Sequence, residues 1–286
     1  MPPELINATD PNSETKRLAM LLWSDAGVGK TSLAATARGN KLWILFDDGG
    51  LDSVQGLRSE LVETKPALDT ALKNVIHKLD YTKEDKVAYV SRFETSNDPL
   101  NIEQYLTNVD LNIQTVVVDS LTTLGDDAIE FAVKYKGFKS STMTKPGLEA
   151  YGARLTLMKM FVQNMLKLTA KHNKDIIFIS HAKDKYDQDE LVEISLALGG
   201  SLANDLGIKF GEIWYMRDSS TKGREIFFVP FQKYKPMKTR MFDKSEGKPT
   251  SFKWKYDISN PDISMEIATW FKQWEDSGYK KIEVPK

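Results

Sequence analysis

A short run of small and polar residues near the start of the chain has the composition of a loop that binds phosphate. The run reads Ser24-Asp25-Ala26-Gly27-Val28-Gly29-Lys30-Thr31-Ser32. In such a loop the backbone amides turn inward to hold an anion, and the N-terminus of the following helix adds the positive end of its dipole. We predict that residues 24–32 bind nucleotide phosphates, that Lys30 reaches the outer phosphates and that the Thr31 hydroxyl ligates Mg²⁺.

The sequence on either side of the loop supports this interpretation. An apolar run, Leu18–Trp23, precedes the loop, and small helix-forming residues follow it as far as Arg38, which gives the strand, loop and helix that the motif requires. Ser24 stands where the pattern usually has its first glycine, at a position where the chain only begins to turn. The alternative is a chance glycine-rich turn with an exposed lysine.

Polar residues also follow three later apolar runs, each at the point where a buried strand would end. They are Asp119, the pair Asp47 and Asp48, and His181. Because ligands of open α/β sheets bind at the carboxyl ends of the strands, these side chains belong beside the phosphates. We predict that Asp119 holds Mg²⁺ and that Asp48, favoured over Asp47, positions the attacking water. We expect His181 to sense the outer phosphate.

Each of these assignments has a purely structural alternative. Asp119 would then cap the next helix, and Asp47 and Asp48 would be turn residues before two glycines. His181 would be a satisfied histidine of the core. The catalytic set that we predict is Lys30, Asp48, Asp119 and His181.

Two segments offer several cations close together. Four lie among the eight residues 233–240, and residues 134–139 interleave lysines with aromatic rings, a mixture that suits single-stranded nucleic acid. Residues 252–256 repeat that mixture. These cations either contact DNA or the phosphates of a neighbouring subunit, or they form solvated surfaces around core aromatics. The candidates are Lys136, Lys139, Lys235, Lys238 and Arg240.

The composition narrows the classes of protein. The 286 residues are 41% hydrophobic and carry a formal net charge of −1, so any attraction to nucleic acid must come from local patches. There is no cysteine, which excludes disulfides and thiolate zinc sites. We see no signal-peptide pattern and no apolar run long enough to span a membrane, and we expect a cytoplasmic protein with no membrane partner.

Apolar runs and helical periodicity alternate along the chain. We predict strands at 18–23, 42–46, 87–93, 113–118 and 176–179, a hairpin of 212–216 with 225–229, and helices at 30–38, 66–79, 99–106, 122–135, 149–170 and about 262–276. This order predicts an α/β fold of three layers, mostly parallel, with an antiparallel C-terminal extension. Residues 1–16 read as a flexible tail, 17–286 as one domain and 183–200 as an irregular, mobile loop. The last helix should turn Ile263, Ile267, Trp270, Phe271 and Trp274 inward.

Two other nucleotide-binding classes fit less well. Thr82–Asp85 matches the T-K-x-D pattern of guanine-specific proteins, but it lies in a polar stretch and not at the end of an apolar strand. Small-molecule kinases usually carry an arginine-rich lid, and residues 183–200 contain no arginine.

Four motifs in order resemble the phage-type P-loop ATPases with a RecA-like core. They are Ala26–Thr31, Phe46–Leu51, Val116–Ser120 and Ile177–His181. Val117-Val118-Asp119-Ser120 is especially similar to the RecA form of the Walker B strand. The resemblance covers residues 17–240.

This resemblance implies an oligomeric, ATP-binding and Mg²⁺-dependent ATPase that binds single-stranded DNA and promotes annealing or recombination. It further implies ATP at subunit interfaces, a single-strand-binding or other recombination protein as partner, and the host cytoplasm as location for a phage-encoded chain. Asp48 takes the place of the usual catalytic glutamate, which implies slow hydrolysis, and His181 matches the polar sensor. Lys235, Lys238 and Arg240 fall where such proteins place cations that act on a neighbour's ATP, and 136–147 and 183–200 correspond to DNA-facing loops.

A second hypothesis belongs to a different class. The near-neutral charge and the aspartate in place of glutamate also fit a nucleotide-dependent assembly or regulatory module without a nucleic-acid partner. Salt-dependent binding to oligonucleotides separates the two hypotheses, because phosphate contacts release counterions.

Overall fold

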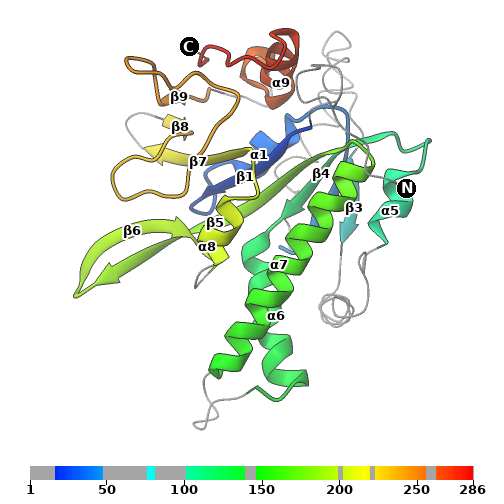
Figure 1. The fold of residues 1–286 in the computed structure, drawn as a ribbon, viewed down its shortest axis with the longest axis vertical. Coiled ribbons are helices and arrows are strands. Elements are labelled where there is room, and N and C mark those ends of the chain that lie inside the picture. The colour runs from blue at the N-terminus through cyan, green and yellow to red at the C-terminus, as the bar shows by residue number, and fades with distance from the viewer. Residues whose placement is uncertain are drawn as a thin grey trace, which may run out of the picture.

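The computed structural model describes residues 17–47, 76–80 (backbone only), 101–138, 146–198, 202–219, 223–255 and 262–285. These residues form a mostly parallel sheet in the strand order β3-β2-β4-β5-β1-β7-β8-β9, with β6 paired to β5 away from this path (Figure 1). β3, β2, β4, β5, β1 and β7 run parallel, and β8, β9 and β6 are antiparallel to their neighbours. The predicted fold class, a layered α/β core with an antiparallel extension, is confirmed.

The strands and helices follow one another in the order that the sequence predicts for most of the chain. The strands are β1 Ala19–Ser24, β2 Asn40–Leu45, β3 Ile76–Asp80, β4 Ile113–Asp119, β5 Asp175–Asp187, β6 Glu190–Leu196, β7 Glu212–Ser219, β8 Gly223–Phe227 and β9 Ser251–Lys253. The helices are α1 Lys30–Ala35, α5 Ile102–Leu106, α6 Leu121–Tyr135, α7 Leu148–Lys171, α8 Leu202–Gly207 and α9 Ile267–Asp276, with a 3₁₀ turn at Ile263–Met265 before α9. In the residues described, no helix is long and apolar enough to cross a membrane.

Both faces of the sheet are covered, because successive side chains of a strand point to opposite faces. On β5, Phe178 packs into a core with α6, α7 and α8, whereas Ile177 packs into a second core with α1 and α9. Figure 1 shows α7 crossing one face of the parallel strands. Burial on both faces explains why β1, β4 and the first half of β5 are continuous apolar runs.

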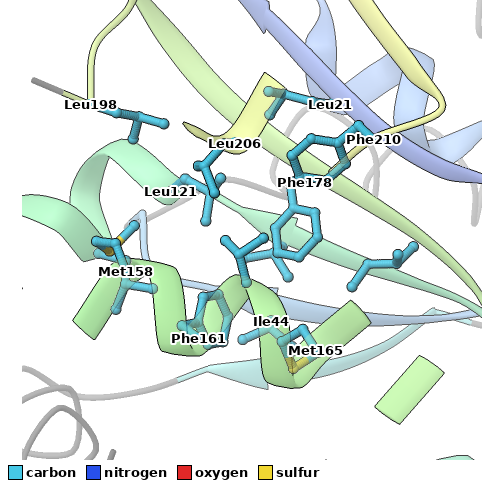
Figure 2. Packing of buried hydrophobic residues seen from close by; sticks show 14 of the residues in the cluster. Leu21, Ile44, Leu121, Met158, Phe161, Met165, Phe178, Leu198, Leu206 and Phe210 are labelled. Carbon is cyan, nitrogen blue, oxygen red and sulfur yellow. The ribbon is translucent and has the colours of Figure 1, made fainter. Parts of the chain in front are cut away.

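A row of phenylalanines fills the core beneath α7. Phe161 of α7 packs edge-on against Phe178 of β5, with ring centroids 6.2 Å apart, and Phe178 packs in turn against Phe210 at 5.5 Å (Figure 2). Phe46, just after β2, meets Phe161 from the other side at 6.1 Å. These contacts fix α7 against the strands that carry the polar residues predicted for the site.

Three local predictions are wrong. Residues 76–79 were expected to end a helix but belong to β3, which places His77 on a strand. Residues 183–196 were expected to be an irregular loop but form the end of β5 and β6, a regular hairpin. The side chain of Ile263 is 56% exposed, because the residues before α9 form a 3₁₀ turn that does not continue its apolar face. The segments predicted at 66–75 and 87–93 lie outside the described residues.

A buried and an exposed position give a prediction for the stability of the protein. Truncating Phe161→Ala removes a fully buried ring that touches Phe46 and Phe178, and we expect a loss of about 3–5 kcal/mol in the free energy of unfolding. Ile263→Ala, at an exposed position that sequence periodicity assigned to the core, should change it by less than about 0.5 kcal/mol. Urea unfolding of both variants measures the difference, and equal losses would contradict the packing described.

Candidate nucleotide-binding site

The loop between β1 and α1 has the backbone conformation of a phosphate cradle. Gly27 and Gly29 have φ values of 76° and 108°, in the left-handed region where a side chain is strained. Gly29 is the residue from which α1 begins, and its carbonyl accepts the backbone N–H of Leu33 at 2.9 Å. These two glycines let the chain reverse tightly enough to present the amides ahead of Lys30 to an anion.

Lys30 lies inside this loop and is 5% exposed. Its Nζ donates to the carbonyl oxygens of Asp25, at 2.8 Å, and Ser24, at 3.2 Å, and to the Ser24 hydroxyl at 3.1 Å. Burial lowers the pKa of Lys30 to about 8, although Asp119, Asp25 and Asp47 oppose the shift. The ammonium is thus held out of water by neutral partners, with carboxylates nearby but none in direct contact.

Thr31 and Asp119 meet at the carboxyl edge of the sheet. The Thr31 hydroxyl, on α1, donates to the Oδ2 atom of Asp119, at the end of β4, over 2.9 Å. Burial raises the pKa of Asp119 to about 6, and the nearby Asp47 adds to the rise. A hydroxyl and a carboxylate side by side are oxygen ligands that Mg²⁺ accepts together with phosphate oxygens and water, so these residues fit a nucleotide bound with magnesium.

Asp47 and His181 form a second polar group beside the first. His181 Nε2 lies 3.7 Å from Asp47 Oδ2, and its Nδ1 lies 3.5 Å from Lys30 Nζ. Burial alone would raise the pKa of Asp47, but interactions with His181, Thr123 and Ser120 outweigh it and lower the pKa below its usual value. The Thr123 hydroxyl donates a hydrogen bond to Asp47 Oδ1. Asp47 is therefore held as an anion.

The hydroxyl of Thr122 positions the backbone of His181. The Thr122 hydroxyl, on α6, accepts the backbone N–H of His181 at 2.9 Å and lies 3.1 Å from the hydroxyl of Ser180. The first turn of α6 thus contacts both the strand of His181 and the carboxylate of Asp47. No sequence pattern singled out Thr122 or Thr123, because their role depends on which strands α6 covers.

Of the five residues predicted to bind the metal ion or take part in catalysis, four come together, and the fifth lies outside the described residues. Lys30, Thr31, Asp119 and His181 meet at the loop, from α1, β4 and β5. Asp48 lies outside the described residues, so its role stays a prediction, and it is the neighbouring Asp47 that contacts His181. Of the other predicted residues, Val28 is buried in the core with α1, Asp25 and Ala26 are exposed in the turn, and Ser32 is half-buried in the first turn of α1.

The predicted cations lie in three different places. Lys136 is exposed after α6, and Lys139 lies outside the described residues. Lys235 is 3.6 Å from Glu193 of β6. Lys238 Nζ donates to the carbonyl of Phe210 at 2.8 Å, and Arg240 follows it at the edge of the sheet where the parallel strands begin. Lys238 and Arg240 are therefore at the opposite edge from this chain's own phosphate loop.

The aromatic residues at 252–254 belong to the core. Phe252 and Trp254 are buried, and the Trp254 indole N–H donates to the carbonyl of Met265 at 3.0 Å. Lys253, between them, is exposed. The alternating pattern is that of a strand with one face in the core, so these two rings are not a stacking surface for nucleic-acid bases.

Sequence reasoning missed Arg224, which lies against the phosphate loop. A Cβ atom at Gly29 would stand 3.3 Å from Arg224 Nη1 and 3.3 Å from the ring of Trp254. Arg224 is on β8, its guanidinium is 5.8 Å from the Trp254 ring centroid, and Asp218 lies 4.0 Å away. The residues around Arg224 in the sequence do not predict its place beside the loop, because that place results from β8 lying two strands from β1 in the sheet.

The raised pKa of Asp119 gives a prediction for stability. The folded carboxyl titrates near pH 6 and an unfolded one near 3.8, so the folded state binds more protons between these values and its stability falls as the pH rises. Asp119→Asn removes this penalty, and without nucleotide or metal we expect about 1–3 kcal/mol higher stability at pH 7.5.

The gain from Asp119→Asn should shrink as the pH is lowered through 6, because the native carboxyl is then protonated. Urea unfolding in the presence of a chelator, at pH 7.5 and pH 5, measures both values. A gain that is the same at the two pH values would show that charge burial is not its cause.

Comparisons with known sequences agree with this geometry. Residues 16–249 match the AAA domain, which is more than half of the chain and includes every residue of the site described above. A search of curated protein sequences finds no match. The chain belongs to the AAA domain family of P-loop ATPases, whose members generally use a nucleotide with Mg²⁺.

Proposed function

We propose that this protein binds ATP with Mg²⁺ at the loop of residues 24–32 and hydrolyses the outer phosphate bond. The observation that carries the proposal is the meeting of Lys30, Thr31 and Asp119 at the carboxyl edge of the sheet, with Asp47 and His181 beside them. In the nucleotide-binding α/β folds, this edge is where phosphates are bound. Members of the family to which the chain belongs are generally ATPases.

The proposed roles follow from the contacts of each side chain. The loop amides and Lys30 bind the phosphates, and Thr31 with Asp119 holds the metal ion, which when bound neutralises charge on the outer phosphates. Asp47 stays ionised at neutral pH, because its pKa is lowered, and so can accept a proton from an attacking water. His181 lies between Asp47 and Lys30, so it responds to a change at either one.

Paired variants separate the two neighbouring aspartates. We expect Asp47→Asn to lower the rate of ATP hydrolysis by roughly 10²–10⁴-fold, the usual contribution of a general base, with little change in ATP affinity. Asp48→Asn is the matched control, and a single-turnover assay with a separate binding measurement gives both quantities. The reverse order of effects would return the role of general base to Asp48, as the sequence alone favoured.

We propose further that the bound nucleotide controls an interaction with single-stranded DNA, and that oligomers of the chain act in annealing or recombination. The support is the resemblance of the motifs to phage-type RecA-like ATPases, together with two exposed lysines near Phe138: Lys134 in the last turn of α6 and Lys136 just after it. The nucleotide-dependent assembly module remains the second candidate. It is favoured by the hairpin of β5 and β6, whose end carries more carboxylates than lysines.

Fluorescence anisotropy of a labelled single-stranded oligonucleotide, with and without ATP and Mg²⁺ over a salt series, tests the DNA proposal. We expect ATP to strengthen salt-sensitive binding. Lys30→Ala should weaken ATP binding by roughly 10–100-fold, since charge-assisted hydrogen bonds contribute about 1.5–3 kcal/mol, and should abolish the effect of ATP on DNA. If no oligonucleotide binds in any nucleotide state, the assembly module becomes the favoured function.

A further inference from the structure

A cationic groove lies at the amino ends of the parallel strands, the edge of the sheet opposite the nucleotide site. Its volume is about 630 Å³, and the start of β1, the end of α7, the start of β7 and α9 contribute to its walls. Three cations line it: Arg17, Lys209 and Arg240. Apolar surface is provided by Leu18, Ala19 and Trp274.

The carboxylate of Glu212, the one carboxylate among the described residues of the groove wall, already has hydrogen-bond partners within the protein. It is buried and accepts hydrogen bonds from the Thr239 hydroxyl at 2.6 Å, the Trp214 indole at 2.8 Å and the backbone N–H groups of Arg240 and Met241. Burial raises the pKa of Glu212, although these hydrogen bonds oppose the shift.

The cations of the groove keep much of their charge available. Among the residues that the structure describes, neither Lys209 nor Arg240 forms an ion pair with a carboxylate, and Arg17 donates to the hydroxyl of Thr169. Lys238, next to the groove, has a lowered pKa from burial and from the proximity of Arg240 and Lys244. The charges of Lys209 and Arg240 are therefore not neutralised by a carboxylate within the described part of the chain, and the groove suits an anionic partner.

The hairpin of β5 and β6 has the opposite charge. Residues 184–190 contain four carboxylates and one lysine, and Asp187, Asp189 and Glu190 form no ion pair in the described residues. Lys235 lies 3.6 Å from Glu193, and Lys233 donates to the carbonyl of Leu191, in the strand pair next to the turn, so neither lysine is paired with Asp187, Asp189 or Glu190. Tyr186 adds a side chain that is 60% exposed.

The end of the hairpin is also preorganised. Asp187 lies opposite Glu190 in the strand register. The two residues between them, Gln188 and Asp189, both have positive φ, as in the tight turns that match the twist of a hairpin. Figure 1 shows this hairpin projecting away from the rest of the sheet. A rigid acidic projection loses little conformational entropy when it docks.

The hairpin cannot reach the groove of its own chain. Ile176 of β5 pairs with Ala19 in the groove wall, and the turn begins eleven residues further along the same strand, a separation of about 36 Å at 3.3 Å per residue. The two surfaces lie at opposite ends of the molecule. A contact between them must join two copies, and such a head-to-tail contact repeats from copy to copy.

We propose that the acidic hairpin of one copy docks into the cationic groove of a second copy, so that the protein assembles head to tail. Asp187 and Glu190 face Lys209 and Arg240 of the second copy, and Tyr186 packs against the apolar part of the groove. Exposed ion pairs contribute only about 0.2–1 kcal/mol each, so the contact needs several of them together with the aromatic anchor. The contact uses neither the phosphate loop nor Asp47, Asp119 and His181, so loss of assembly and loss of ATP binding are separable.

A charge-swap experiment tests this contact. The groove variant carries Lys209→Glu and Arg240→Glu, and the hairpin variant carries Asp187→Lys and Glu190→Lys, which avoids the positive-φ positions. We expect the unmodified protein to associate at low salt and to dissociate in ~1 M salt, where the Debye length is about 3 Å. Each variant alone should sediment as a monomer, and an equimolar mixture should recover assembly, because both complementary pairs are then restored.

The matched control is Lys280→Glu with Lys281→Glu, the same change of charge at two exposed residues outside the groove, and it should associate like the unmodified protein. Circular dichroism and thermal unfolding establish that every variant is folded. A monomeric unmodified protein, variants that associate normally, or a mixture that stays monomeric would each overturn the proposal. So would a groove variant that still assembles but loses oligonucleotide binding, because the groove would then be a nucleic-acid site.

Discussion

The buried charges around Lys30 are the constraint on which the rest of the site depends. Burial lowers the pKa of Lys30 and raises that of Asp119, so each group is pushed toward its neutral form. The two have no direct ion pair to offset this cost, since Lys30 donates to backbone carbonyls and a hydroxyl, and Asp119 accepts from Thr31. A phosphate chain with a divalent cation supplies both missing counter-charges, and the arrangement is therefore more favourable with ligand than without.

The sheet is what holds these charges in place. β5 lies between β1 and β4, so His181 stands between the loop that carries Lys30 and the strand that ends at Asp119. α6 begins directly after that strand, and its first turn supplies Thr122 to the strand of His181 and Thr123 to Asp47. Continuous apolar strands covered on both faces allow little movement, which suits a site that depends on small separations between polar atoms.

The parts of the site that could be predicted from the sequence are those in which the neighbouring residues along the chain determine both the type and the position of the functional side chain. The loop of residues 24–32 carries its own glycines and lysine, and Asp119 and His181 follow unmistakable apolar strands. The contact of Asp47 with Thr123 depends on the position of α6, which the sequence does not reveal. Arg224 is about two hundred residues from the loop in sequence and approaches it only because β7 and β8 extend the sheet.

The fold, like the site, could be predicted only where the local sequence pattern determines the structure. Buried parallel strands can be predicted from their apolar composition. β3 and the end of β5 contain charged residues, so their composition does not predict a strand. Residues 76–79 continue a helical spacing of apolar residues, and only pairing with β2 makes them a strand. The hairpin was missed because the end of β5 is exposed and β6 is only half-buried for most of its length, so burial imposes no clear alternation of apolar and polar residues on the two strands.

β5 connects the two ends of the molecule. Its first residues pair with β1 beside the cationic groove, its middle carries His181 at the nucleotide site, and its last residues form the acidic hairpin. The hairpin pairing starts at Ala182, one residue after His181, and the backbone N–H of His181 is held by Thr122. A shift of His181 in response to the nucleotide would therefore be passed directly into the hairpin, because the two share one continuous strand with no loop between them to absorb the movement.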